Sequence, residues 1–210
     1  MSLATRVVIF AKAPLPGYAK TRLIPALGAQ GAAQLAESML CHAVSEACAA
    51  MPGQVELCVT PGPDAACWQA VRARDWPVQW SAQGEGDLGA RLARAARRHL
   101  GTGNAVLLIG TDCPGLNAGY LSRAVRRLGR ADAVLGPSTD GGYVLLGLKR
   151  WRVEPFEGIQ WGSPQVAAQT VSRIAALGWS LAELPALSDV DEPGDLHALP
   201  DGWLERSPAH

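Results

Sequence analysis

Residues 7–23 read VVIFAKAPLPGYAKTRL. The stretch begins with a short apolar run, rich in β-branched residues, which predicts a buried strand over Val7–Ala11. A loop with two prolines and a glycine follows, and it carries Lys12, Lys20 and Arg22. In an open α/β sheet, ligands bind outside the carboxyl ends of the strands, and the prolines restrict the loop that holds the cations. We therefore expect this loop to bind an anion, most simply a phosphate or a diphosphate.

The simpler alternative for this loop is three solvated cations that bind nothing, an arrangement common on protein surfaces. No carboxylate lies between Met1 and Gln34, however, so no acidic side chain nearby in sequence offsets the three charges. We therefore favour the anion site.

The composition is that of a globular protein. The chain has 210 residues, 48% of them hydrophobic and 18% charged, which favours a single domain over residues 1–210. Its 19 basic and 19 acidic residues balance, so we expect no nucleic-acid or membrane partner. No apolar run reaches the roughly 20 residues that cross a bilayer, and the N-terminus lacks a signal-peptide layout, so we expect a cytoplasmic protein. Five cysteines without a C-x-x-C pair and four scattered histidines argue against a zinc site or disulfide framework.

Strand-like and helix-like segments alternate along the chain, which predicts parallel βαβ units with helices on both faces of the sheet. The most strongly apolar segment, residues 104–110, is typical of a central parallel strand. The alternation breaks at residues 137–141, a short loop between two strands, which predicts an antiparallel or mixed part of the sheet. The predicted strands are 7–11, 55–60, 78–81, 104–110, 131–136, 142–148 and 180–184. The predicted helices are 30–51, one capped by Asp64 that carries Trp68 and Val71, 87–100, 118–128, 163–177 and 192–199.

Residues 109–115 read IGTDCPG and follow that central strand. A carboxylate here, Asp112, lies where active sites lie in open α/β sheets. The alternative is a helix-capping aspartate, which would contribute about 1 kcal/mol to stability. We favour the functional role, because the acid stands between glycines and a proline at the ligand-binding edge.

Residues 136–143 read GPSTDGGY. The Asp-Gly-Gly sequence is compatible with a plain hairpin turn. Tyr143, directly after it, offers a ring for stacking and a hydroxyl for hydrogen bonding, so we favour a site in which Asp140 holds sugar hydroxyls or serves as a base. Further along, Trp161 fits an acceptor pocket and the protein core equally well.

Residues 187–196 read LSDVDEPGDL and contain four acids within seven positions, from Asp189 to Asp195. An Asp-x-Asp sequence before a proline-started helix serves either as a cap or as a magnesium site, since hard cations take carboxylate oxygens. Alone, the acids favour the cap. Together with Asp112 and a cationic phosphate loop they favour a metal, because a metal diphosphate needs carboxylates plus basic side chains.

Residues 84–89 read GEGDLG and match the G-x-G-x-x-G dinucleotide fingerprint. The match is weak, because the chain contains 23 glycines and the preceding strand is half polar. Glu85 and Asp87 would also repel a pyrophosphate. A dehydrogenase is therefore disfavoured, and no Walker A motif is present.

Five motifs together resemble the DUF2064 family, which is described as GT-A-type glycosyltransferases of the nucleotide-diphospho-sugar transferase superfamily. The resemblance covers residues 7–199 in one order, and the opening loop is also similar to that of guanylyltransferases acting on 2-phospholactate and, more distantly, molybdenum cofactor. The family more often shows Ser-Thr where this chain has Gly162-Ser163. The motifs are K-x-P-x-P-G-x-x-K-T-R-L from Lys12, Q-G-x-G-D-L-G-x-R from Gln83, G-T-D-x-P from Gly110, G-P-x-x-D-G-G-Y from Gly136 and D-V-D-x-P-x-D-L from Asp189.

The resemblance implies a single-domain, Rossmann-like three-layer α/β/α sandwich with a mostly parallel, mixed sheet. It also implies a nucleotide in the amino-terminal half and a Mg²⁺ or Mn²⁺ ion at Asp112, with Asp191 as the second acid. The predicted nucleotide- and phosphate-binding residues are Ala11, Lys12, Pro14, Gly17, Lys20, Arg22, Gln83 and Asp87. The predicted acceptor-binding residues are Gly141, Gly142, Tyr143 and Trp161, and the predicted catalytic residues are Asp112, Asp140 and Lys20.

The function we expect is metal-dependent transfer of a sugar from a nucleotide-diphosphate donor to a small acceptor. The metal and the cationic loop would stabilise the negative charge that the leaving diphosphate gains. The nearest alternative is a nucleotidyltransferase that joins a nucleoside triphosphate to a phosphorylated small molecule and releases pyrophosphate. A non-catalytic nucleotide- or sugar-binding protein is the other alternative. The sequence leaves open the sugar, the base, the acceptor, the stereochemical outcome and the oligomeric state.

Overall fold

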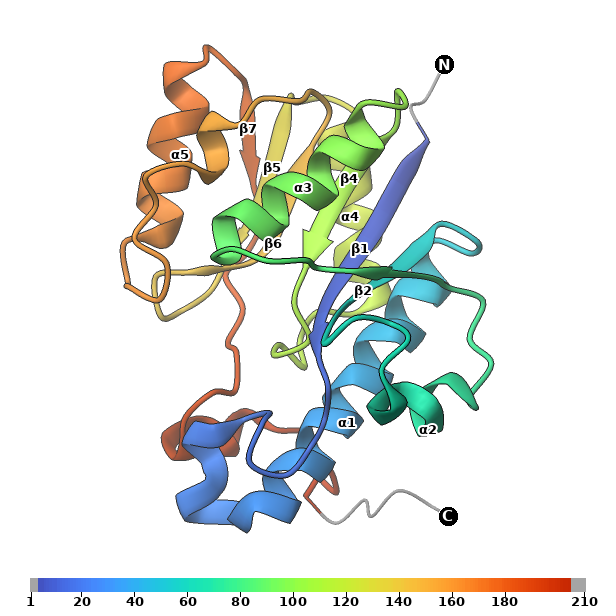
Figure 1. The fold of residues 1–210 in the computed structure, drawn as a ribbon. Helices are drawn as coiled ribbons and strands as arrows, with labels where there is room; N and C mark the ends of the chain where they lie inside the picture. The colour runs from blue at the N-terminus through green and yellow to red at the C-terminus, as the bar shows by residue number, and fades with distance from the viewer. Residues whose placement is uncertain (1–3, 205–210) are drawn as a thin grey trace.

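In the computed structural model, which describes residues 4–204, a seven-stranded mixed sheet forms the centre (Figure 1). Its strands are β1 (Thr5–Lys12), β2 (Val55–Thr60), β3 (Gln79–Ala82), β4 (Ala105–Ile109), β5 (Ala133–Pro137), β6 (Tyr143–Leu148) and β7 (Leu181–Glu183). They lie in the order β3-β2-β1-β4-β6-β5-β7. Strands β3, β2, β1 and β4 are parallel, whereas β6 is antiparallel to both β4 and β5. The antiparallel part is therefore where the sequence predicted it, at the short loop between β5 and β6.

Helices cover both faces of the sheet, which confirms the α/β/α sandwich. On one face lie α1 (Ile24–Ala50), α2 (Gln69–Arg72) and α4 (Ala118–Leu128), and on the other lie α3 (Leu88–Leu100) and α5 (Val166–Ala176). Successive residues of β1 point to opposite faces, as expected of a strand. Val7 and Ile9 pack with α1 and α4, whereas Val8 packs with α3. None of the helices in residues 4–204 combines the length and hydropathy needed to cross a membrane.

The first helix begins earlier than its predicted start at residue 30. It starts at Ile24, with a proline in its first turn, and Gly28 interrupts it with a φ of 70°. That left-handed backbone conformation suits glycine, so the helical periodicity of the sequence becomes regular only after this kink.

Three other helix predictions need correction. Asp64 makes no capping hydrogen bond, because a 3₁₀ turn, η2 (Ala66–Trp68), starts beside Ala65 and leads into the four-residue α2. The helix predicted from residue 163 starts at Val166. The segment predicted as a helix over 192–199 forms a 3₁₀ helix, η4 (Pro193–Ala198). The remaining 3₁₀ turns are η1 (Thr21–Leu23) and η3 (Glu154–Phe156).

The chain after β7 crosses below the sheet and packs against the loop that follows β1 (Figure 1). A separate apolar cluster holds this contact together, with Leu23 and Val190 at its centre, each 0% exposed. Trp203 closes the cluster from the carboxyl-terminal side. Two segments that are 170 residues apart in sequence are thereby brought together beside the carboxyl end of β1.

Candidate active site

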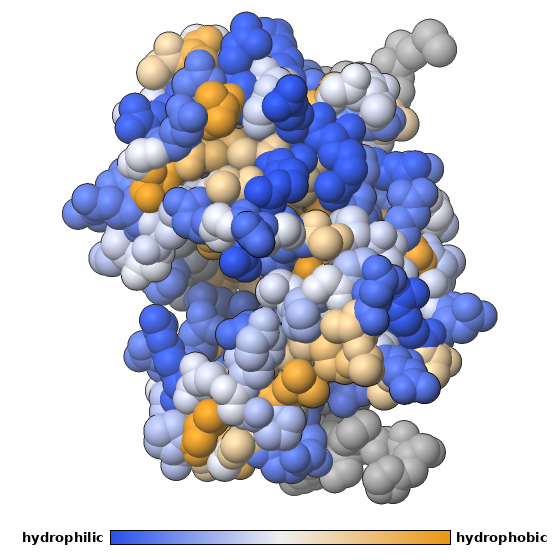
Figure 2. Space-filling view, in the orientation of Figure 1, coloured by the Kyte–Doolittle hydropathy of each residue, from blue (hydrophilic) through white to orange (hydrophobic). Residues whose placement is uncertain are grey.

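A cavity of about 810 Å³ opens at the carboxyl ends of β1 and β4. Figure 2 shows the surface hollowed between the sheet-bearing body and the lower segment that contains the loop after β1. The amino end of β6, the first turns of α3 and the segment after β7 complete its walls. Most of the predicted site residues line it: Ala11, Lys12, Lys20, Arg22, Gln83, Asp112, Asp140, Gly142, Tyr143, Trp161 and Asp191.

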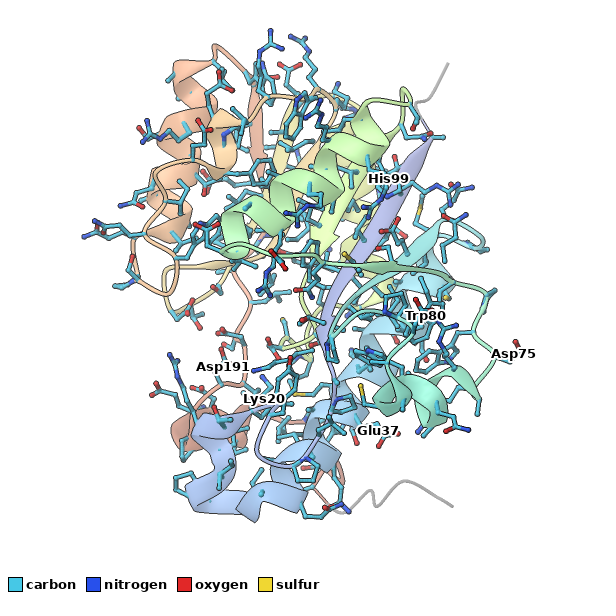
Figure 3. The ribbon with its side chains drawn as sticks, viewed as in Figure 1. Lys20, Glu37, Asp75, Trp80, His99 and Asp191 are labelled. Atoms are coloured by element: carbon cyan, nitrogen blue, oxygen red, sulfur yellow. The ribbon has the colours of Figure 1, made fainter. Side chains whose placement is uncertain are left out.

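Lys20 lies between two carboxylates at the centre of this cavity. Its Nζ is 2.5 Å from Oδ1 of Asp112 and 2.8 Å from Oδ1 of Asp191, and it donates to the carbonyl of Val190 at 2.6 Å. Figure 3 shows Lys20 and Asp191 pointing toward one another from their separate segments. The Lys20 side chain is 6% exposed, whereas those of the two aspartates are 46% and 43% exposed. The ammonium is therefore buried beneath two carboxylates that still face the cavity.

The charge of Lys20 is secured by its partners. Burial by itself lowers the pKa of this ammonium, but the charges of Asp112 and Asp191 outweigh burial and raise the pKa above its ordinary value. Lys20 is therefore a permanent cation at neutral pH. The main chain reinforces the arrangement, because the amide of Val190 donates to the Asp112 carbonyl at 2.8 Å.

The other two cations of the loop have different surroundings. The Lys12 ammonium lies 4.2 Å from the centroid of the Tyr18 ring. Arg22 is 68% exposed and approaches Glu192 at 3.6 Å, a surface pair that contributes little to stability. Lys12 and Arg22 thus remain available to a ligand, whereas Lys20 is already bridged by carboxylates.

The first turn of α3 adds an arginine, Arg91, for which no binding role was predicted. The Arg91 guanidinium lines the cavity, donates to the Gly86 carbonyl at 2.8 Å and forms no ion pair with any described carboxylate. Gln83 is less available, because its amide nitrogen donates to the carbonyls of Ala11 and Cys58 at 3.0 and 3.1 Å. Gln83 therefore connects β1 and β2 to the segment after β3, and it positions the turn that leads into α3.

The opposite wall carries carboxylates and aromatic rings. Asp140 accepts hydrogen bonds from the Ser138 hydroxyl and, at 2.9 Å, from the Gly142 amide. Tyr143 and Trp161 meet edge to face, with ring centroids 6.3 Å apart. The Tyr143 hydroxyl is buried without a hydrogen-bond partner among residues 4–204, and burial raises its pKa. This wall holds the residues predicted to bind the acceptor.

Asp189, for which no role in the site was predicted, also lines the cavity. Burial, and then the neighbouring charge of Asp140, raise the pKa of Asp189 to about 6. The sequence did contain a signal for Asp189. In an extended segment, residues two positions apart point to the same side, so Asp189 is expected on the same side as Asp191. A similar signal existed for Arg91, which lies one helical turn after Asp87.

Four predicted site residues do not line the cavity. Asp87 caps α3, since its carboxylate accepts a hydrogen bond from the Ala90 amide at 2.8 Å. Gly141 has a φ of 91° and sits against the backbone of Pro164, so it shapes the turn that presents Asp140. The remaining two belong to the loop after β1 and are Pro14 and Gly17.

The donor set at the centre fits a divalent cation. Mg²⁺ prefers oxygen ligands and is usually held by one or two carboxylates together with waters and substrate phosphates. Asp112 and Asp191 supply two carboxylates at one point, and both are partly exposed to the cavity. The described residues contain no group of three or more His, Cys, Asp or Glu side chains arranged to hold a metal. With two carboxylates as ligands, a Mg²⁺ ion here would have coordination positions left for waters and a substrate phosphate.

Comparison with known proteins identifies the family and the fold of the chain. The model of a family described as "Uncharacterized protein conserved in bacteria (DUF2064)" matches residues 43–163. The "putative nucleotide-diphospho-sugar transferase" of Desulfovibrio desulfuricans G20 is 30% identical, with a TM-score of 0.80 over 90% of this chain and 82% of that one. The comparison with curated proteins found no match.

More distant structures share the fold alone. A cytidylyltransferase from Leptospira borgpetersenii is 14% identical, with a TM-score of 0.55 over 87% of this chain and 76% of that one. Rv0371c of Mycobacterium tuberculosis H37Rv, solved as a complex with manganese, is 19% identical, with a TM-score of 0.51 over 98% of this chain and 100% of that one. The fold is thus that of nucleotide-diphospho-sugar transferases and nucleotidyltransferases.

Proposed function

Since the chain belongs to the DUF2064 family and has the fold of nucleotide-diphospho-sugar transferases, we propose that it is a metal-dependent glycosyltransferase. It would move a sugar from a nucleotide-diphosphate donor to a small acceptor. The observation that carries the proposal is the Asp112–Lys20–Asp191 centre, which lies at the carboxyl ends of the central strands inside a cavity of about 810 Å³. We also propose that residues 1–210 act as one transferase domain, because the seven described strands form one sheet.

The donor diphosphate would lie against the cationic wall. Lys12, Arg22 and Arg91 line that wall, and the structure pairs none of them with a buried acid. As the bond between the sugar and the diphosphate breaks, the leaving group gains negative charge, and fixed cations stabilise it. Charge stabilisation of this type is commonly worth several kcal/mol. A magnesium or manganese ion held by Asp112 and Asp191 would supply further positive charge to the diphosphate when bound.

The acceptor hydroxyl would approach from the opposite wall. Its oxygen forms the new bond to the anomeric carbon of the donor sugar, and its proton passes to the Asp140 carboxylate. Two hydrogen bonds, from Ser138 and Gly142, fix the orientation of that carboxylate. Asp140 is thus the residue best placed to act as general base, with Tyr143 and Trp161 as the aromatic wall.

A thermal-shift panel tests the proposal. The ligands are nucleoside triphosphates, UDP-, GDP- and TDP-sugars and NAD(P), each with and without Mg²⁺ or Mn²⁺. A ligand at 100 times its Kd stabilises the native state by about 2.7 kcal/mol. We expect a metal-dependent shift with a nucleotide sugar, and we expect Asp112→Asn to abolish it while the protein still unfolds cooperatively.

Two other outcomes of the panel would contradict glycosyl transfer. A shift confined to nucleoside triphosphates, with pyrophosphate as the product, would establish nucleotidyl transfer instead. No shift with any nucleotide would contradict both enzymatic functions.

A further inference from the structure

The charged residues that line the cavity are divided between its two walls. The cations all come from the first 91 residues, and the carboxylates all come from residue 112 onward. The strand order sets apart most of the elements that carry them, since β3, β2 and β1 lie on one side of β4 while β6, β5 and β7 lie on the other. The two groups meet at Lys20, which contacts Asp112 and Asp191. The cations are Lys12, Lys20, Arg22 and Arg91, and the carboxylates are Asp112, Asp140, Asp189 and Asp191.

Ion pairs within the site decide which of these charges remain available to a ligand. Lys20 is bridged by Asp112 and Asp191, so it offers no free charge to a ligand. Lys12, Arg22 and Arg91 therefore form the charge of the donor wall. Asp140 and Asp189 form the charge of the acceptor wall, and no lysine or arginine among the described residues lines that wall with them.

Two carboxylates close together repel one another, and a cation between them relieves that repulsion. The protein itself provides an example, because the Lys20 ammonium lies between Asp112 and Asp191. On the acceptor wall, the charge of Asp140 raises the pKa of Asp189, and neither carboxylate forms an ion pair with a described lysine or arginine. Its aromatic residues, Tyr143 and Trp161, favour cations and sugar rings over anions, because the face of an aromatic ring is negative.

We propose that the second substrate is a hydroxyl compound that is uncharged or carries an amine, and that phosphorylated acceptors are rejected. This inference rests on the proposed function, since it takes the cationic wall to hold the donor diphosphate. It also separates glycosyl transfer from nucleotidyl transfer. A nucleotidyltransferase would have to place an acceptor phosphate, as the nucleophile, against Asp140 and Asp189 with no cation to offset them.

Charged thiol reagents test the electrostatics without knowledge of either substrate. Ser163→Cys places a thiol on the acceptor wall, and Thr21→Cys places one beside Arg22 on the donor wall. Each variant is labelled with a cationic and an anionic methanethiosulfonate, and the wild type gives the background of the five native cysteines. The measured quantity is the ratio of the cationic to the anionic labelling rate, divided by the same ratio for a free thiol. We expect this value to be about tenfold above one at residue 163 and below one at residue 21. Equal rates at residue 163, or faster anionic labelling there, would overturn the inference.

Matched acceptors then test the substrate class. Glucose, glucosamine and glucose 6-phosphate form one set, and glycerol, 2-amino-1,3-propanediol and glycerol 3-phosphate form a second. Binding is measured by calorimetry on the protein saturated with Mg²⁺ and a nucleoside diphosphate. In each set we expect the phosphate ester to bind about tenfold more weakly than its partners, a factor that equals about 1.4 kcal/mol. Asp140→Asn combined with Asp189→Asn should remove that difference.

Each of the remaining outcomes overturns the inference: a phosphate ester that binds as tightly as its neutral partner, or two sets in which charge makes no difference. The thiol rates are read without any nucleotide. They therefore stay informative if the protein binds no nucleotide, in which case the proposed function fails by itself.

Discussion

Lys20 shares a loop with Lys12 and Arg22, yet the three side chains have different surroundings. Lys20 is held by Asp112 and Asp191, Lys12 lies over an aromatic ring, and Arg22 is exposed. The sequence predicted a cationic loop, but it did not predict that the three cations have different partners. The reason is that the partners of Lys20 come from the end of β4 and from the segment after β7, and only the folded chain brings them together.

The first prediction concerns Lys20→Met. The ammonium offsets one of the two carboxylate charges at the centre, so its removal makes the site more negative. We expect the variant to bind free Mn²⁺ about tenfold more tightly than the wild type in the absence of nucleotide. Electron paramagnetic resonance titration measures the free ion directly. Lys20→Arg, which keeps the charge, and Lys12→Met, which removes a neighbouring charge that does not bridge the carboxylates, should leave the affinity nearly unchanged. Unchanged or weaker binding by Lys20→Met would show that the ammonium does not compete with the ion.

A second prediction concerns Glu56, which is buried at 3% exposure away from the cavity. Burial alone raises the pKa of this carboxyl, but hydrogen bonds from His99 and Ser81, with the charge of Arg98, lower the pKa to about 2. A carboxyl whose pKa is depressed on folding stabilises the native state above its unfolded pKa, and this stabilisation is lost as the pH falls toward the folded value. The window here runs from about 4.5 down to about 2.

Urea unfolding of the wild type and Glu56→Gln measures this contribution. At neutral pH we expect the substitution to lower the free energy of unfolding by about 3 kcal/mol, the equivalent of the pKa shift. The difference between the two proteins should shrink steadily below about pH 4.5. A difference that stays constant down to about pH 3 would mean that the ionised carboxylate is not what stabilises the fold.

At the scale of elements, the sequence predicted strands and their directions correctly where an apolar run or a short connecting loop marks them. The run over residues 104–110 became the central β4, and the short loop after β5 marked the antiparallel turn into β6. Within the glycine pattern at residues 84–89, Asp87 caps α3 and Gly89 packs closely against its neighbours. The early start of α1 was missed, because Gly28 breaks the helical periodicity within its first turns.

The third prediction belongs to α3. A Cβ on Gly89 would lie 2.6 Å from the Phe156 carbonyl oxygen and 2.6 Å from Nε1 of Trp161. The first turn of α3 thus touches the loop that carries the aromatic acceptor wall. Gly89→Ala should cost about 1–3 kcal/mol by overpacking, partly offset by about 1 kcal/mol from better helix propensity, so we expect a net loss in urea unfolding.

Gly194→Ala is the matched control for this substitution, because a Cβ there meets nothing within 4 Å and the backbone is not left-handed. It should change the free energy of unfolding by less than about 0.5 kcal/mol. If the two alanine variants are equally stable, the contact between α3 and the Trp161 loop is looser than the structure shows.

At the scale of the whole molecule, the site depends on the return of the chain after β7. The acids that flank Lys20 come from that segment and from the end of β4, and the cluster around Leu23, Val190 and Trp203 holds the segment in place. Periodicity predicts individual elements, but it carries no information on which distant segments pack together. This explains why the sequence suggested an acidic cluster near Asp191 without revealing that Lys20 is its partner.

The same dependence leads to the last prediction. Trp203 is 9% exposed and packs edge to face with His42, ring centroids 5.1 Å apart. Trp203→Ala should lower the free energy of unfolding by about 3 kcal/mol, in the usual range for a buried aromatic residue, and should weaken the magnesium-dependent nucleotide shift. Leu148→Ala is the control. This buried residue pairs with Val106 of β4 and Ala133 of β5, at the strand ends opposite the cavity, and its loss should cost a similar amount of stability. If both variants lose the nucleotide shift equally, general destabilisation explains the loss. If Trp203→Ala alone loses it, the returning segment is what keeps Asp191 against Lys20.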